Sequence, residues 1–132
     1  MPALDTNVLV RWLVDDDQEQ AAVVRGLLES AIRNQESLFI PITVLVELEW
    51  VLRARYRFSR SLIESTLVAL LEARELSIQS EGSVECALQF CRQSSADVAD
   101  CLHVGLCAME GQGPLLTFDR EAGKLPDVLL PG

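Results

Sequence analysis

Positive charge is scarce in this sequence. Its 132 residues include 11 lysines and arginines against 20 aspartates and glutamates, which gives a formal net charge of −9. A broad basic surface that would bind nucleic acid by releasing counterions is therefore not expected. A cationic partner, a divalent metal ion or a local basic patch is compatible with this total. The clearest basic run comprises Arg53, Arg55, Arg57 and Arg60, but a helix C-terminus followed by a solvated turn explains it equally well.

Long apolar segments are also absent. No stretch approaches the roughly 20 apolar residues that cross a membrane as a helix. The first residues include the charged Asp5, Arg11 and Asp15, which a signal peptide would not have in its apolar segment. We therefore expect a soluble cytoplasmic protein. Apolar residues make up 49% of the chain, and its length fits one domain spanning residues 1–132.

Cysteine and histidine, the usual zinc ligands, are few. The chain has four cysteines, none of them in a CxxC pair, and a single histidine. A zinc site made of Cys101, His103 and Cys107 is therefore weakly supported. We expect the cysteines to be reduced and to act as small core residues.

Apolar residues recur with periods that alternate between those of strands and helices. Strands are predicted at residues 2–5, 37–41, 75–80, 115–118 and 128–130, and helices at 7–14, 18–33, 43–56, 60–74, 83–94 and 97–110. This alternation predicts an α/β fold in which helices cover both faces of a parallel sheet of four to five short strands. Ligands of such sheets bind beyond the carboxyl ends of the strands, where Asp5 and Asp119 are expected.

Two acids occur in the helix predicted at 97–110, which is otherwise apolar nearly all round. Asp97 and Asp100 are three residues apart and so are neighbours on the helix surface. Asp97 fits a capping box in which Ser94 is the cap. Asp100 lies a turn further in, where capping does not explain it, and it is therefore a candidate site residue. We expect His103 to be an ordinary polar residue rather than a ligand.

A further acid comes from the helix predicted at 43–56. Glu47 and Glu49 lie on opposite borders of its apolar stripe, and spacing alone does not choose between them. Carboxylates that converge to about 4 Å repel by about 4 kcal/mol per pair at an effective dielectric near 20. A hard cation such as Mg²⁺ or Mn²⁺ removes that penalty. Asp5 would then be a metal ligand, with a hydrogen bond from Thr6 or Asn7 to it or to its neighbours.

Four segments of the chain resemble PIN-domain ribonucleases, and most closely the VapC-like toxins of bacterial toxin–antitoxin pairs. They read "LDTNVLVRWL", "IPITVLVELEWVL", "DVADCLHVG" and "LLTFDREAGKL", and they occur in the order and spacing of that family. The resemblance implies the family fold, a parallel sheet flanked by helices. It also implies four site acids, which are Asp5, Glu47, Asp100 and Asp119. Glu47 is thereby preferred over Glu49.

The resemblance further implies metal-dependent hydrolysis of RNA phosphodiester bonds. Asp5 and Asp100 would be the principal ligands of Mg²⁺ or Mn²⁺, and the other two acids would complete the shell directly or through water. Asn7 and Thr117 match supporting polar positions, and Asp97 matches a position that is often acidic. A basic antitoxin protein and a homodimer are expected from the family.

Two other functions are compatible with the same acids. A receiver-type domain would bind Mg²⁺ and accept a phosphoryl group, but it would need an acidic pair after the first strand and a late lysine. Here Asp5 stands alone and the only lysine is Lys124, near the end of the sequence. A PIN-like interaction module without activity is less favoured because all four acids are present.

Overall fold

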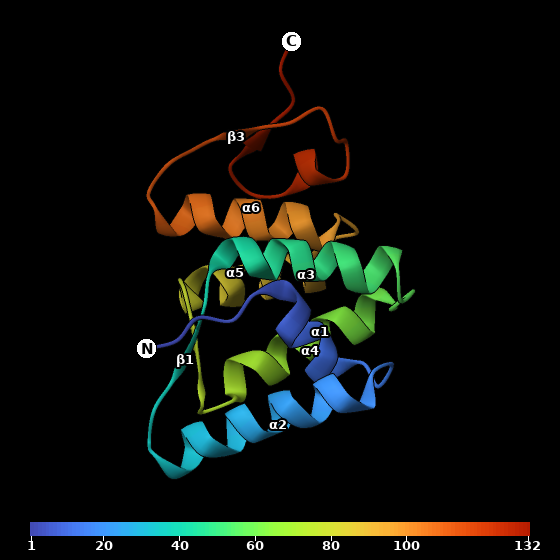
Figure 1. Ribbon diagram of the computed structural model, residues 1–132. Helices are drawn as coiled ribbons and strands as arrows, with labels where there is room; N and C mark the ends of the chain where they lie inside the picture. The colour runs from blue at the N-terminus through green and yellow to red at the C-terminus, as the bar shows by residue number, and fades with distance from the viewer. The chain divides into compact units, whose positions relative to one another are not determined.

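The computed structural model describes residues 1–132 and divides into two compact units, residues 1–79 and residues 80–132 (Figure 1). The first unit contains α1 (Thr6–Leu13), α2 (Gln18–Arg33), β1 (Leu38–Ile40), α3 (Ile42–Ala54), α4 (Arg60–Glu72) and β2 (Leu76–Ile78). The second unit contains α5 (Glu81–Gln93), α6 (Val98–Met109), β3 (Leu115–Leu116), the 3₁₀ helix η1 (Ala122–Lys124) and β4 (Val128–Leu129). No helix is long and apolar enough to cross a membrane.

The strands of the first unit run parallel. β1 pairs with β2 in a register that joins Leu38 to Leu76. On the other side of β1, Ala3 forms a parallel bridge to Phe39, and the Leu4 N–H donates to the Phe39 carbonyl at 2.8 Å. The chain before Asp5 therefore runs alongside β1, and Asp5 follows it at the carboxyl end, as the sequence predicts.

Local capping explains where two helices of this unit begin. The Asp17 carboxylate accepts from the Gln20 N–H at 3.0 Å at the start of α2. The Ser59 hydroxyl accepts from the Leu62 N–H at 3.2 Å at the start of α4. Each bond satisfies a backbone donor that the first helical turn leaves without an intrahelical partner. Both helix starts confirm the sequence prediction.

The core of the first unit is made of aliphatic side chains that repeat at helical spacing. On α3 these are Leu45, Leu48 and Leu52, which are at most 1% exposed, and they lie at intervals of three and four residues. Ile40 on β1 and Ile63 on α4 are buried to the same degree. Burial of each such side chain stabilises the fold by roughly 1.5–3 kcal/mol. This packing determines which face of α3 is left for solvent.

In the second unit α5 and α6 pack closely because one position has no side chain. A Cβ on Gly105 of α6 would lie 2.3 Å from the carbonyl oxygen of Ser83, which is fully buried on α5. Any larger residue at 105 would force the two helices apart. β3 and β4 form a second parallel ladder, in which Leu115 pairs with Val128.

The α/β class and the parallel pairing of the strands are confirmed. The strands are shorter than predicted and form two separate two-stranded ladders, one in each unit, rather than one continuous sheet. Cys91 and Cys101 are buried, as expected for small core residues, whereas Cys86 and Cys107 are half-buried.

Candidate metal centre

Three carboxylates converge in the second unit. Asp97, Asp100 and Asp119 each offer one oxygen, and these oxygens all lie within 4.8 Å of one another. Asp97 and Asp119 are exposed and Asp100 is half-buried. Two of the four predicted site acids, Asp100 and Asp119, are therefore brought together, and Asp97 joins them.

The first two acids come from the start of α6. Asp97 is the N-cap residue of this helix, but its side chain makes no capping hydrogen bond. The predicted capping box is wrong, because Ser94 instead ends α5, where its hydroxyl donates to the Phe90 carbonyl at 2.8 Å. Asp97 and Asp100 are thus neighbours at the positive end of the α6 dipole, which stabilises their charges.

Asp119 is held by backbone groups in the turn beyond β3. Its Oδ1 accepts from the Ala122 N–H at 2.8 Å, and its own N–H donates to the Thr117 hydroxyl at 3.1 Å. Thr117 thus shapes the turn that presents Asp119, which gives physical content to its predicted supporting role. These bonds orient the carboxylate independently of any ligand.

A side-chain contact ties together the two segments that carry the cluster. The Ser95 hydroxyl, which precedes Asp97, donates to Glu121, which follows Asp119, at 2.5 Å. Lys124 lies 3.1 Å from the other oxygen of Glu121. The hydrogen bond from Ser95, followed by Lys124, lowers the pKa of Glu121 below its ordinary value. Glu121 therefore keeps its charge as a fixed partner.

The remaining predicted acids belong to the first unit. Asp5 is the N-cap of α1, and its Oδ1 accepts from the Val8 N–H at 3.1 Å. The Thr6 hydroxyl donates to Oε1 of Glu47. Of the two hydrogen-bonding residues considered from the sequence, Thr6 is therefore the one that contacts a site acid. Asn7 is exposed and lines a mostly apolar groove of about 340 Å³ on α1 and α2 together with Asp5.

Burial separates the two glutamates that the sequence could not. Glu49 is 2% exposed, and its Oε1 accepts from Nε of Arg53 at 2.8 Å, one turn along α3. Its Oε2 is buried without a hydrogen-bond partner. Glu47 is exposed on the same helix and is therefore accessible to a ligand. The choice of Glu47 from the family resemblance stays a prediction.

The chemistry of the acid cluster fits a hard divalent cation. All three donors are carboxylate oxygens, the ligand type that Mg²⁺ and Mn²⁺ prefer. The thiol and imidazole ligands of α6 do not converge in this way. Cys101 is buried, whereas His103, two residues later, is exposed. At 4.8 Å each pair of carboxylates repels by about 3.5 kcal/mol at an effective dielectric of 20. A bound cation would remove this repulsion.

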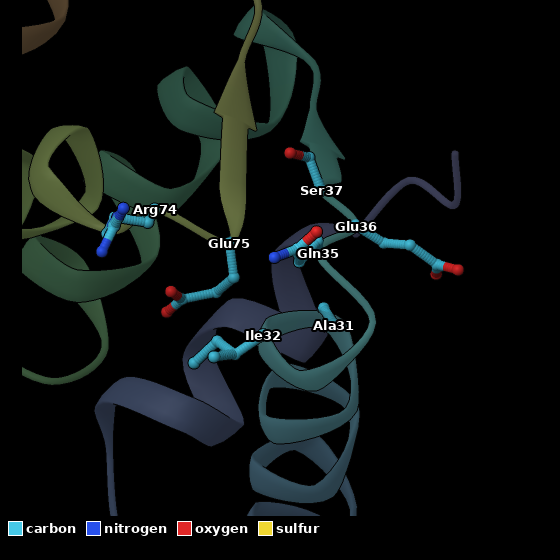
Figure 2. A pocket seen from close by; sticks show the side chains of 7 residues that line it. All are labelled: Ala31, Ile32, Gln35, Glu36, Ser37, Arg74 and Glu75. Carbon is cyan, nitrogen blue, oxygen red and sulfur yellow. The ribbon is translucent and has the colours of Figure 1, made fainter.

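A further hollow of the first unit lies elsewhere. It has a volume of about 450 Å³ and is lined by Arg74 and Glu75 before β2 and by Gln35, Glu36 and Ser37 before β1. Figure 2 shows the Glu36 side chain extending away from Arg74 and Glu75. This hollow is at the amino ends of the strands, whereas Asp5 follows a carboxyl end, so it does not contain the predicted site.

Comparison with known proteins identifies the family. A family model described as PIN domain matches residues 3–128, which is nearly the whole chain. The chain belongs to the PIN domain family. This PIN domain is also 24% identical over 125 residues to a protein named VapC ribonuclease from Aquifex aeolicus (strain VF5), covering 95% of this chain and 92% of that protein. The family resemblance seen in the sequence is thus confirmed.

The sequence predicts that Asp97 takes part in capping α6, yet its carboxylate lies in the cluster with Asp100 and Asp119. Two sequence features of Asp97 indicate a place in the cluster. It lies three residues before Asp100, and it matches an often acidic position of the family. Only the missing cap bond shows that the side chain is available for another role.

Proposed function

We propose that this PIN domain is a metal-dependent endoribonuclease and the toxin of a toxin–antitoxin pair. The observation that carries the proposal is the convergence of Asp97, Asp100 and Asp119 to within 4.8 Å in a chain of this family. The relative named VapC ribonuclease supports RNA as the substrate. We further infer that residues 1–132 act as one domain, since the family match extends across both units.

The cation would be Mg²⁺ or Mn²⁺. When bound, it supplies charge stabilisation at the scissile phosphate and makes a water molecule more acidic. Asp100 and Asp119 would hold it, and Asp97 is a third donor in reach. Asp5 is the other principal ligand that the family resemblance assigns, and Glu47 completes the set of acids.

Three of these side chains have a support that fixes their orientation. The Val8 N–H holds Asp5, the Thr6 hydroxyl holds Glu47, and the Ala122 N–H holds Asp119. Pre-organised ligands of this kind lower the cost of assembling a metal site, because the side chains lose little freedom when the ion binds.

Two partners belong to the same proposal. The net charge of −9 and the acid cluster suit an antitoxin with basic residues, and the family resemblance favours a homodimer. Co-expression with the neighbouring gene followed by purification tests the first partner. A small basic protein should co-elute, and a chain that purifies alone would contradict the pairing.

An RNA cleavage assay tests the nuclease directly. Wild type should cut single-stranded RNA with Mg²⁺ or Mn²⁺ and lose activity in a chelator. Asp5→Asn and Asp100→Asn should each lower the rate by orders of magnitude. Glu85→Gln, at an exposed position of α5, is the matched control and should cut like wild type. Equal cleavage by all four proteins would assign the activity to a contaminant or another site.

A further inference from the structure

One face of α3 is open to solvent along the whole helix. Its members recur at intervals of four, three and four residues, which is the spacing of a single helical stripe. They are Thr43, Glu47, Trp50 and Ala54, and all four are exposed. The stripe therefore includes the candidate site acid Glu47 and continues to the last residue of α3.

Trp50 is the unusual member of this stripe. A large aromatic side chain is normally mostly buried, yet Trp50 is 49% exposed. It lies three residues after Glu47, so the two side chains are neighbours on the helix surface. Its indole is therefore a flat apolar surface directly adjacent to a proposed site acid.

Cations gather at the same end of the helix. The guanidinium of Arg55, the C-cap residue of α3, lies 5.8 Å from the centre of the Trp50 ring. Arg57 follows as an exposed residue. Arg53, on the same helix, is held in an ion pair, so the cations considered for this surface are Arg55 and Arg57. Eight residues separate Glu47 from Arg55, which corresponds to about 12 Å along the helix axis.

We propose that this face of α3 binds single-stranded RNA, with a base stacked on Trp50 and a backbone phosphate on Arg55. The inference rests on the proposed ribonuclease function and deepens it by naming a substrate-binding surface. An exposed aromatic ring beside cations is the combination that single-strand binders use, because any base can stack on the ring while arginines neutralise phosphates.

Local charge favours RNA as the occupant. The exposed Arg55 and Arg57 match the phosphates of a polyanion. A strand that stacks on Trp50 would also pass Glu47, which brings its backbone toward the proposed acids. A base pair buried inside a duplex could not stack on the ring, so single strands should be preferred.

Binding to the non-cleaving Asp100→Asn protein tests the surface, measured by fluorescence anisotropy with a labelled single-stranded RNA. Trp50→Ala should weaken binding by roughly 5- to 100-fold, and Trp50→Phe should restore most of the loss, because a ring is retained. Arg55→Ala should lower the salt dependence of binding by about 0.7 in the log–log slope, the value for one phosphate of a single strand. Arg25→Ala, at an exposed position of α2, is the charge-matched control and should leave that slope unchanged.

Three results would overturn the inference. The first is unchanged affinity for RNA in both Trp50→Ala and Trp50→Phe, and the second is equal affinity for duplex and single-stranded RNA. The third is a Trp50→Ala protein that light scattering shows to be a monomer when the parent protein is a dimer. The last result would assign the face to a contact between copies. Wild-type cleavage, measured in parallel, separates this inference from the proposed function. Trp50-dependent binding without cleavage would contradict only the nuclease, and cleavage with Trp50-independent binding would contradict only the surface.

Discussion

Neutralising Asp119 should stabilise the metal-free protein and reduce the stability that it gains from metal. Asp119 forms two of the three carboxylate pairs in the cluster, and the paired oxygens lie within 4.8 Å. At that separation a pair repels by about 0.9 kcal/mol in water and by about 3.5 kcal/mol at an effective dielectric of 20. Asp97 and Asp119 are exposed, so the value in water is the closer one. Asp119→Asn should therefore raise the free energy of unfolding without metal by roughly 1–2 kcal/mol at low ionic strength.

The substitution leaves the local fold intact, because an asparagine oxygen can still accept from the Ala122 N–H. A gain of this size corresponds to roughly 4–8 °C in Tm for a chain of this length. The stabilisation by metal should be smaller in the variant. A cation at 100 times its Kd stabilises the wild type by about 2.7 kcal/mol. A tenfold weaker site at the same concentration would lose about 1.4 kcal/mol of that increment.

Thermal unfolding with and without Mn²⁺ measures both effects on the same proteins. Wild type should gain several degrees from the metal, and Asp119→Asn should start higher and gain less. Glu85→Gln, which removes one charge from the same unit outside the cluster, should keep the wild-type increment. A variant that is less stable without metal, or one that gains as much from Mn²⁺ as wild type, would refute the reasoning.

Other predictions address the supports in the first unit. Thr6→Val removes the hydroxyl that donates to Glu47, and it should lower the rate of RNA cleavage by about tenfold. Thr6→Ser keeps a hydroxyl, so it should restore the cleavage rate and leave the thermal stability unchanged. Ser59→Ala removes the N-cap of α4 and should cost about 1 kcal/mol in urea unfolding, whereas Ser59→Asp should retain the stability of wild type. The Tyr56 hydroxyl donates a hydrogen bond to the Asp16 carboxylate at 2.7 Å. This bond is the main cause that lowers the pKa of Asp16 below its ordinary value of 3.8, and Arg11 lowers it further. The stability that this interaction contributes is present above pH 3.8 and is lost as the pH falls through the lower native pKa. Acid unfolding of Tyr56→Phe should therefore show less of this loss, and a profile that is parallel to wild type would contradict the assignment.

Much of the secondary structure followed from local chemistry. The helix predicted at 18–33 has those bounds in the structure, and the helix predicted to begin at residue 60 begins there, where Ser59 caps it. Caps and apolar periods act within a few residues of one another, so they can be evaluated from sequence alone. The same kind of argument failed at Ser94, because its hydroxyl found a partner in the preceding helix instead of capping the next one. Competition between two adjacent helix ends is not visible in a short motif.

The sequence by itself determined the chemical character of this protein: an acidic α/β chain with hard oxygen donors at strand ends and in an apolar helix, in the pattern of the PIN domain family. Only the tertiary structure decided how individual acids are used. It buried Glu49 against Arg53 while leaving Glu47 exposed, and it brought Asp97 into contact range of Asp119. The physical reason is that burial and convergence depend on which segments pack together, and residues distant in the sequence set that packing. Charge and periodicity, in contrast, are properties of the chain before it folds.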